Sequence, residues 1–332
     1  MTIEKRSVRP GDEGLRLDRW LKKYYPALPH TLVQKLVRTG QVRVDGGRMK
    51  ADARVSAGQE IRIPAHFAAT PAEAAPSLKP PPGLSKADRD FIERMIVFEN
   101  DFIVVLNKPF GIAVQGGTKT SRHLDGLLGG MADRFGGERP RLVHRLDRDT
   151  SGILVVAKDR QTAARLGHLF QTRSVQKIYW AVTRGVPKPM QGKVEAPLVK
   201  AAGPEGDRVR KARPGEQDLA QHATTYYSVI DKVAQKMAWI SLKPVTGRQH
   251  QLRAHMDILG TPIVGDAKYG DFADLPIDGI ENKLHLHARR LTLKDVKVGD
   301  IDISAPLPSH MAATFELLGF DAQRYGEAGQ QY

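Results

Sequence analysis

Two hydrophobic periods alternate along the chain, and together they predict a mixture of helices and strands. Residues 16–24 and 32–40 repeat apolar side chains at helical spacing, with basic side chains on the remaining positions. Short β-branched runs at 102–106 and 153–157 are typical of buried strands, and residues 160–173 return to the helical period. Further strands are expected at 177–182, 224–231, 237–243 and 284–293.

The same patterns divide the chain into parts. Six prolines fall between Pro64 and Leu84, and proline at this density removes amide donors and favours an extended spacer. The polar, glycine-containing segment from Lys200 to Gln221 predicts a mobile loop. We expect a small domain at 1–64, a Pro/Ala-rich linker at 65–85, a larger α+β domain at 86–320 and a flexible tail at 321–332.

The chain is strongly basic, with a formal net charge of +14 and a pI near 9.9. Residues 1–64 hold 14 Lys and Arg against 7 Asp and Glu, a net +7 that is half of the total. Because Lys and Arg neutralise phosphates, RNA or DNA is the expected partner. An acidic lipid surface fits less well, because no basic amphipathic helix has a broad aromatic and leucine face. A basic protein without a nucleic-acid partner remains an alternative.

Several protein classes are disfavoured by what the sequence lacks. It contains no cysteine, which excludes disulfides, thiolate metal sites and thiol nucleophiles. It has no apolar signal region at the N-terminus and no run near the ~18 apolar residues of a membrane helix, so we expect a soluble, cytoplasmic protein. The P-loop, the dinucleotide-binding glycine pattern and the G-x-S-x-G elbow are also missing, which removes the usual nucleotide-binding and hydrolase interpretations.

The densest polar stretch, residues 144–152, immediately precedes the apolar run at 153–157. Its titratable side chains cannot all be buried without partners, because unpaired buried charge costs several kcal/mol. They therefore either lie on an open rim or form a site, and a solvated loop is the alternative. The charged members are His144, Arg145, Asp147, Arg148 and Asp149.

A second polar cluster spans residues 246–255. Thr246 is placed to cap a helix whose inner face carries Leu252, Met256 and Leu259. Arg248 would then lie in the first turn of the helix, where a cation is electrostatically disfavoured unless an anion pairs with it. Asp147 could be that anion, and a purely structural salt bridge is the alternative.

Four histidines invite a metal interpretation, but their spacing argues against it. His250 and His255 are five residues apart with no acid between them, whereas a metallohydrolase helix needs ligands at i and i+4 with a carboxylate base between. His285 and His287 fall on one face of a strand, where packing or RNA contact is the commoner role. We expect no metal site.

The basic N-terminal part resembles the S4 RNA-binding domain, a family named after a ribosomal protein. The similarity rests on R-L-D-R-W-L at 16–21 and K-L-V-R-T-G-Q-V-R-V-D-G at 35–46. It implies a small α+β domain whose basic helical face grips structured RNA. The residues it assigns to that face are Arg16, Arg19, Lys35 and Arg38.

The larger part resembles the RluA-type pseudouridine synthases. Four motifs carry the similarity, in order and at natural spacing, between about residues 95 and 320: N-K-P at 107–109, H-R-L-D-R-D-T-S-G at 144–152, K-I-Y at 177–179 and G-R-Q-H-Q-L-R-A-H at 247–255. With the S4-like part, the segment G-I-A-V-Q-G-G at 111–117 resembles the RluC subgroup, which modifies large-subunit ribosomal RNA. The resemblance implies an α+β catalytic fold with a mixed, mostly antiparallel sheet.

The same resemblance implies residue roles. Asp147 would be the nucleophile that acts at ribose C1′ or assists glycosidic cleavage, after which the uracil rotates and rejoins through C5. Tyr179 would lie against the uracil and help remove the C5 proton, and Arg248 would pair with Asp147 and keep it ionised. Such an isomerisation keeps every atom and needs no cofactor. The RNA-binding side chains would include Arg145, Arg148, Lys108 and Arg253.

We therefore expect a monomeric RNA-modifying isomerase that flips its uridine out of the stack. Two alternatives from other classes remain. A non-catalytic RNA-binding or ribosome-assembly protein could retain the same fold. A metal-dependent nuclease would cleave RNA rather than rearrange it.

Overall fold

The structure is a computed structural model and describes residues 3–26, 28–65, 84–116, 122–201, 208–270, 275 and 277–324. The chain forms two compact units, Met1–Pro81 and Pro82–Tyr332. Most of the expected linker and of the expected tail lies outside the described residues. Within the described part, no helix has the length and apolar character needed to cross a membrane.

The first unit combines a small antiparallel sheet with two short helices. Its strands lie in the order β1 (Ile3–Ser7), β3 (Glu60–Pro64) and β2 (Arg43–Val44), and the short 3-10 turn η1 (Pro10–Asp12) follows β1. The apolar positions of α1 (Leu17–Tyr24) and α2 (His30–Arg38) pack into one core with the inner face of β3. The core residues include Leu17, Trp20, Leu21, Val33, Leu36, Ile61 and Ile63.

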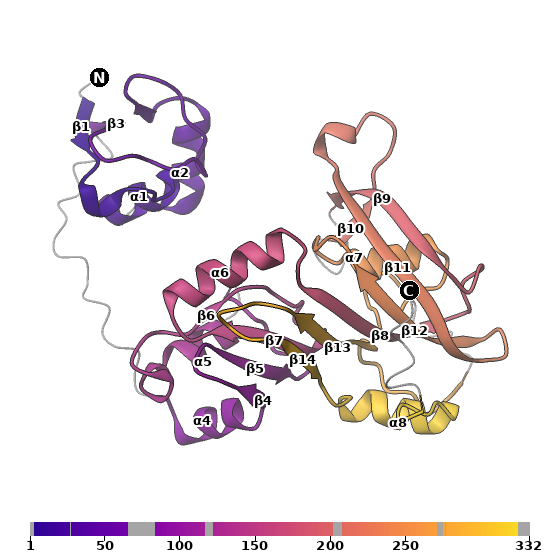
Figure 1. The fold of residues 1–332 in the computed structure, drawn as a ribbon. Helices are drawn as coiled ribbons and strands as arrows, with labels where there is room; N and C mark the ends of the chain where they lie inside the picture. The colour runs from indigo at the N-terminus through magenta and orange to yellow at the C-terminus, as the bar shows by residue number, and fades with distance from the viewer. Residues whose placement is uncertain are drawn as a thin grey trace. The chain divides into compact units, whose positions relative to one another are not determined.

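The second unit is built on one long mixed sheet, in which nine strands follow the order β10-β9-β11-β12-β8-β13-β7-β5-β4 (Figure 1). Strand β14 pairs with β13 and β6 pairs with β7. All the recorded pairings are antiparallel except that of β13 with β7. The strands are β4 (Ile96–Glu99), β5 (Ile103–Lys108), β6 (Arg141–Leu142), β7 (Ser151–Ala157), β8 (Gln176–Arg184), β9 (Gln191–Ala201), β10 (Arg208–Lys211), β11 (Gln221–Val233), β12 (Met237–Pro244), β13 (Leu286–Leu293) and β14 (Ile301–Ser304).

Helices and 3-10 turns flank this sheet. The N-cap of α6 is the Asp159 side chain, which accepts a hydrogen bond from Thr162 N at 2.8 Å. Helix α6 contacts β7 and β6, whereas α7 contacts β9, β10 and β11. These elements are α4 (Lys86–Glu93), α5 (Leu124–Gly129), η2 (Ala132–Phe135), α6 (Arg160–Gln171), η3 (Gln217–Leu219), α7 (Gln251–Ile258) and α8 (Ser309–Leu318).

The expected α+β fold with its mostly antiparallel sheet is confirmed, but two local expectations were wrong. The segment from Lys200 to Gln221 is not one irregular loop, because β10 pairs with β9 and η3 precedes β11. Its residues 202–207 lie outside the described part. The helix expected after Thr246 begins only at Gln251, and its N-cap position is His250 rather than Thr246.

The polar stretch that was singled out in the sequence leads directly into the centre of the sheet. At its end, Gly152 has φ +105°, and a Cβ built there would lie 2.3 Å from the carbonyl oxygen of Ala288 on β13. The parallel register pairs Ala288 with Gly152. Glycine is required here because a side chain would both strain the backbone and push β13 away from β7.

We predict that Gly152→Ala lowers the free energy of unfolding by about 2 kcal/mol or more, because strain and a backbone clash add. Gly167 in α6 is the matched control, since a Cβ there meets nothing within 4 Å. Gly167→Ala should be neutral or stabilise the protein by about 0.5–1 kcal/mol through helix propensity. Denaturant unfolding of both variants measures the contrast, and equal stabilities would contradict the close approach.

Candidate active site

His144 anchors the start of the polar stretch 144–152 to β7. Its Nε2 accepts a hydrogen bond from Val155 N at 2.8 Å, and its ring stacks on Phe170 of α6 with centroids 4.6 Å apart. Burial, helped by the nearby charge of Lys177, lowers the pKa of His144 to about 3. A neutral ring that accepts from a backbone amide is a structural element, so His144 holds the stretch in place.

Lys108 was expected to contact RNA, and that expectation was wrong. The residue is fully buried at 0% exposure. Its ammonium donates to the carbonyl oxygens of Pro109 at 2.9 Å, Ile112 at 3.0 Å and Arg148 at 2.8 Å. All three N–H donors are therefore satisfied inside the protein. Lys108 ties the end of β5 to the stretch that carries Asp147.

Arg253 is the arginine that faces Asp147. Its Nη1 lies 3.8 Å from Asp147 Oδ2, while its Nε and Nη2 donate to the two oxygens of Asp266 at 2.7 and 2.6 Å. The Arg253 side chain is only 6% exposed and that of Asp266 is 0% exposed. Although burial opposes the charge, Asp266 and then Asp147 raise the pKa of Arg253. Arg253, which was expected to bind substrate or RNA, is therefore a buried cation between two carboxylates in the lining of a cavity.

His250 is a second neighbour of Asp147 that the sequence did not single out as part of this pair. Its Nε2 lies 3.9 Å from Asp147 Oδ2, and its Nδ1 lies 3.3 Å from the Tyr269 hydroxyl. The same hydroxyl accepts from Val209 N of β10 at 2.7 Å. His250 has φ +50°, a left-handed conformation that is uncommon for a non-glycine residue and is found preferentially at functional sites.

Arg248 does not occupy the place expected for it. It is exposed on the turn before α7, and its Nε donates to the carbonyl oxygen of His222 at 3.3 Å. The Gln251 side chain holds this turn, since its Oε1 accepts from Thr246 Oγ1 at 2.7 Å and from Arg248 N at 3.0 Å. Because α7 begins later than expected, the arginine on its first full turn is Arg253. The expected pairing of Arg248 with Asp147 is corrected to Arg253.

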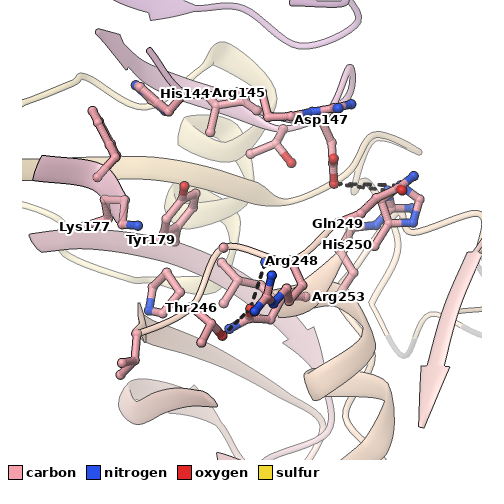
Figure 2. Close-up of a pocket in the computed structure, with 18 of the residues that line it drawn as sticks. His144, Arg145, Asp147, Lys177, Tyr179, Thr246, Arg248, Gln249, His250 and Arg253 are labelled. Carbon is pink, nitrogen blue, oxygen red and sulfur yellow. Dashed lines mark hydrogen bonds and ion pairs between the residues drawn. The ribbon is translucent and has the colours of Figure 1, made fainter. Parts of the chain in front are cut away.

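One cavity of about 740 Å³ in the second unit is lined by His144, Asp147, Arg248, His250 and Arg253 (Figure 2). Tyr179 of β8 enters it, and burial together with the charge of Asp147 raises the pKa of its hydroxyl. Its phenol is therefore neutral over the physiological range. The charged and polar lining includes His144, Arg145, Asp147, Arg173, Lys177, Tyr179, Lys200, Arg248, Gln249, His250 and Arg253.

His285 and His287, which were considered above as possible metal ligands, are packed inside the protein. His285 Nε2 lies 2.8 Å from Thr314 Oγ1, and His287 Nδ1 lies 2.9 Å from Ser151 Oγ. Burial lowers the pKa of His285 to about 4 and that of His287 to about 3. In the described ranges, no three His, Asp or Glu side chains form a group that could hold a metal ion.

The other basic residues named from the sequence lie on the surface. In the second unit Arg145 and Arg148 are exposed, and Arg148 pairs with Asp149 at 3.0 Å. In the first unit Arg19 is exposed, and a groove of about 870 Å³ is lined by three expected residues. The same groove contains Arg48 and Lys50, which no periodic pattern had indicated. Its basic lining is Arg16, Lys35, Arg38, Arg48 and Lys50.

Comparison with known proteins identifies both units. Residues 102–257 match the family model described as RNA pseudouridylate synthase, and residues 15–61 match the S4 domain. A protein of Rickettsia typhi named ribosomal large subunit pseudouridine synthase C is 34% identical, over 88% of this chain and 94% of its own. The chain belongs to the RNA pseudouridylate synthase family. It is an isomerase that acts on RNA, as the motifs had implied.

Other relatives extend this result. Ribosomal large subunit pseudouridine synthase C of Haemophilus ducreyi is 35% identical over 92% of both chains. RNA pseudouridine synthase 4, mitochondrial, of Arabidopsis thaliana is 34% identical over 90% of this chain and 78% of its own. Among solved structures, human RNA pseudouridylate synthase domain containing 4 superposes with a TM-score of 0.58 at 32% identity, over 69% of this chain and 95% of that one.

We predict that His144→Gln makes the protein less sensitive to acid. The folded-state pKa of His144, about 3, lies below the unfolded value near 6.5, so its contribution to stability is present above pH 6.5 and is lost as pH falls. Glutamine can still accept from Val155 N but does not titrate. Between pH 7 and 4.5 the wild type should lose about 2–3 kcal/mol more unfolding free energy than the variant. Parallel pH profiles from denaturant unfolding would contradict a neutral His144.

Proposed function

We propose that this protein converts uridines of large-subunit ribosomal RNA to pseudouridine, in the cytoplasm, with Asp147 as the nucleophile. The names of the relatives from Rickettsia and Haemophilus support this RNA target. The observation that carries the residue assignment is the position of Asp147 in the cavity beside Arg253, which Asp266 holds in turn. The fold and the motifs support the chemistry, and the S4 unit supports binding of structured RNA.

Arg253 takes over the role first given to Arg248. A carboxylate in a cavity acts as a nucleophile only in its ionised form, and a fixed cation nearby favours that form. Arg253 is suited to this because its bidentate bond to Asp266 fixes the guanidinium before RNA arrives. Asp266 also balances the charge, so that Arg253 remains stable in the absence of substrate.

Tyr179 provides a ring face rather than a strong base. Its raised pKa keeps the hydroxyl protonated, and a neutral phenol is a poor proton acceptor. The ring lies in the cavity near Asp147, where a flipped uracil can pack against it. We infer that any help of Tyr179 in removing the C5 proton requires a hydrogen-bonded partner such as Asp147.

RNA must be held while the target nucleotide leaves the stack, which costs a few kcal/mol. Arg145 and Arg248, which line the cavity, and Arg148, which follows Asp147, are exposed and can meet phosphates or bases. Lys35 and Arg38 of the groove in the first unit add contacts that do not depend on base identity. Binding and chemistry are thus assigned to different residues.

Asp147→Asn should abolish pseudouridine formation, with a fall of about 10⁴-fold or more in single-turnover rate, because an amide cannot act as the nucleophile. Its RNA affinity should remain close to that of the wild type. Pseudouridine mapping of ribosomal RNA in cells with and without the protein, followed by assay of the variant on the mapped target, measures both. Retained activity in the variant would contradict the nucleophile. Affinity without any pseudouridine in the wild type would favour the non-catalytic alternative, and cleaved RNA would favour the nuclease.

Arg253→Met and Arg248→Met should separate the two arginines. Removing Arg253 leaves the buried carboxylate of Asp266 unpaired, so unfolding free energy should fall by about 3–5 kcal/mol and activity should be lost. Arg248 is exposed, so Arg248→Met should change stability by less than about 0.5 kcal/mol and act mainly on RNA binding. Arg253→Lys tests whether a point charge without the bidentate geometry restores the rate. The reverse order of effects would reinstate Arg248 as the partner of Asp147.

A further inference from the structure

Lys108 and Lys177 of the second unit differ in their burial and in what surrounds their ammonium groups. The ammonium of Lys108 donates to three carbonyl oxygens. Lys177 of β8 is half-buried, and this partial burial lowers its pKa. Its ammonium forms no hydrogen bond or ion pair with the residues that the structure describes, and its recorded contact is with the Phe170 ring, at 5.9 Å from the centroid. A half-buried ammonium without a partner in the protein is left to water or to an acceptor that arrives from outside the chain.

The position of Lys177 indicates where that acceptor lies. Lys177 and Tyr179 are two residues apart on β8, so their side chains leave the same face of the sheet. Both line the cavity that contains Asp147, and in Figure 2 Tyr179 lies between the two charged residues. Asp147 raises the pKa of Tyr179, whereas Lys177 lowers that of His144. The carboxylate and the ammonium therefore occupy different parts of one cavity, with the tyrosine ring between them.

Among the described residues, the neighbours of Lys177 do not neutralise its charge. His144 is neutral and its Nε2 is already occupied by Val155 N. Phe170 offers only the face of its ring. Arg173, which also lines the cavity, is a further cation. The ammonium of Lys177 thus has no ion-pair partner among the described residues, and it is suited to a substrate group that carries or gains negative charge.

The proposed reaction creates such a group on the uracil, and the inference rests on that proposed function. When the C1′–N1 bond breaks, both electrons remain with the ring, and the negative charge spreads from N1 to the oxygens O2 and O4. After the ring rotates, its C5 supplies the electron pair for the new C1′–C5 bond. Where Asp147 has formed an ester bond to C1′, that bond breaks as C5 attacks. The proton on C5 then leaves, and N1, which has lost its bond to the sugar, gains a proton, so atoms and charge balance over the isomerisation.

We propose that Lys177 is a further catalytic residue, whose ammonium donates a hydrogen bond to a ring oxygen of the flipped uracil and stabilises its negative charge between cleavage and rejoining. Asp147 acts at the sugar end of the nucleotide, Tyr179 packs against the ring and Lys177 meets the far edge. A donor fixed in a cavity that excludes water acts most strongly on charge that develops during the reaction. The role holds whether the sugar forms a covalent intermediate with Asp147 or a different one.

A phosphate is the other RNA group that could neutralise Lys177. We favour the base because Lys177 shares a strand face and a cavity with Tyr179, whose ring has the shape to receive a base. The two occupants differ in their consequences. A lysine on a phosphate strengthens binding of RNA before and during the reaction alike, whereas a lysine on the leaving uracil acts on the chemical step.

The test compares uridine with 5-fluorouridine at the target position of one RNA, using the full-length protein in single-turnover assays at saturating enzyme. Fluorine withdraws electrons, so the fluorinated ring stabilises its own negative charge better and depends less on a nearby cation. Because fluorine prevents the final loss of a proton from C5, the assay follows disappearance of the starting nucleotide after digestion. RNA affinity is measured separately at equilibrium.

Lys177→Met should slow the reaction of uridine by about 10²–10³-fold with little change in RNA affinity. Its effect on 5-fluorouridine should be about tenfold smaller, since the benefit of the cation falls as the leaving group becomes less basic. Lys177→Arg should recover part of the rate. Gln176→Met is the matched control, because Gln176 is exposed, precedes Lys177 on β8 and leaves the opposite face of the strand.

Other outcomes overturn the proposal in distinguishable ways. Equal losses with uridine and 5-fluorouridine, or a loss confined to RNA affinity, would assign Lys177 to a phosphate. An unchanged uridine rate in Lys177→Met would remove it from the reaction altogether. Lys177→Gln replaces the methionine variant if that one fails to fold. If the wild-type protein forms no pseudouridine, the proposed function is refuted instead. This result is obtained before any variant is compared.

Discussion

The buried bidentate pair between Arg253 and Asp266 is the constraint on which the candidate site depends. Removing two charges from water is costly, and the attraction between them repays that cost only in good geometry. Here Asp266 accepts from both Nε and Nη2 of Arg253, which leaves Nη1 directed toward Asp147. The guanidinium therefore forms a close bidentate pair with Asp266 and also faces the carboxylate of Asp147, which lines the cavity. A lone arginine could not be buried at this place, and a flexible surface arginine would not hold one orientation.

The order of strands in the sheet determines which residues meet this pair. The Asp147 stretch leads into β7, Tyr179 and Lys177 lie on β8, and β13 separates the two strands. Strand β12, on the other side of β8, leads through the turn at 245–250 to α7 and Arg253. Asp147 and Arg253, more than 100 residues apart in sequence, thus converge although two strands, β13 and β8, lie between β7 and β12. The close contact of Gly152 with Ala288 keeps this spacing narrow.

Much of this arrangement could be predicted from the sequence, and the exceptions have physical causes. The apolar runs gave the strands, and the two polar clusters marked the loops that form the site. The choice between Arg248 and Arg253 depended on where α7 begins, and the unusual φ of His250 moves that start past Thr246. No propensity scale anticipates a left-handed histidine.

The sequence also did not reveal which charged side chains are buried. A lysine beside a proline turn reads as a surface residue, yet Lys108 is surrounded by three carbonyl oxygens that come from two separate segments. Asp266, the partner of Arg253, follows it by 13 residues in an irregular segment that carries no motif. Only the fold reveals that these groups are satisfied internally. Lys177 differs from both groups, because it is only half-buried and its ammonium has no hydrogen-bond or ion-pair partner among the described residues.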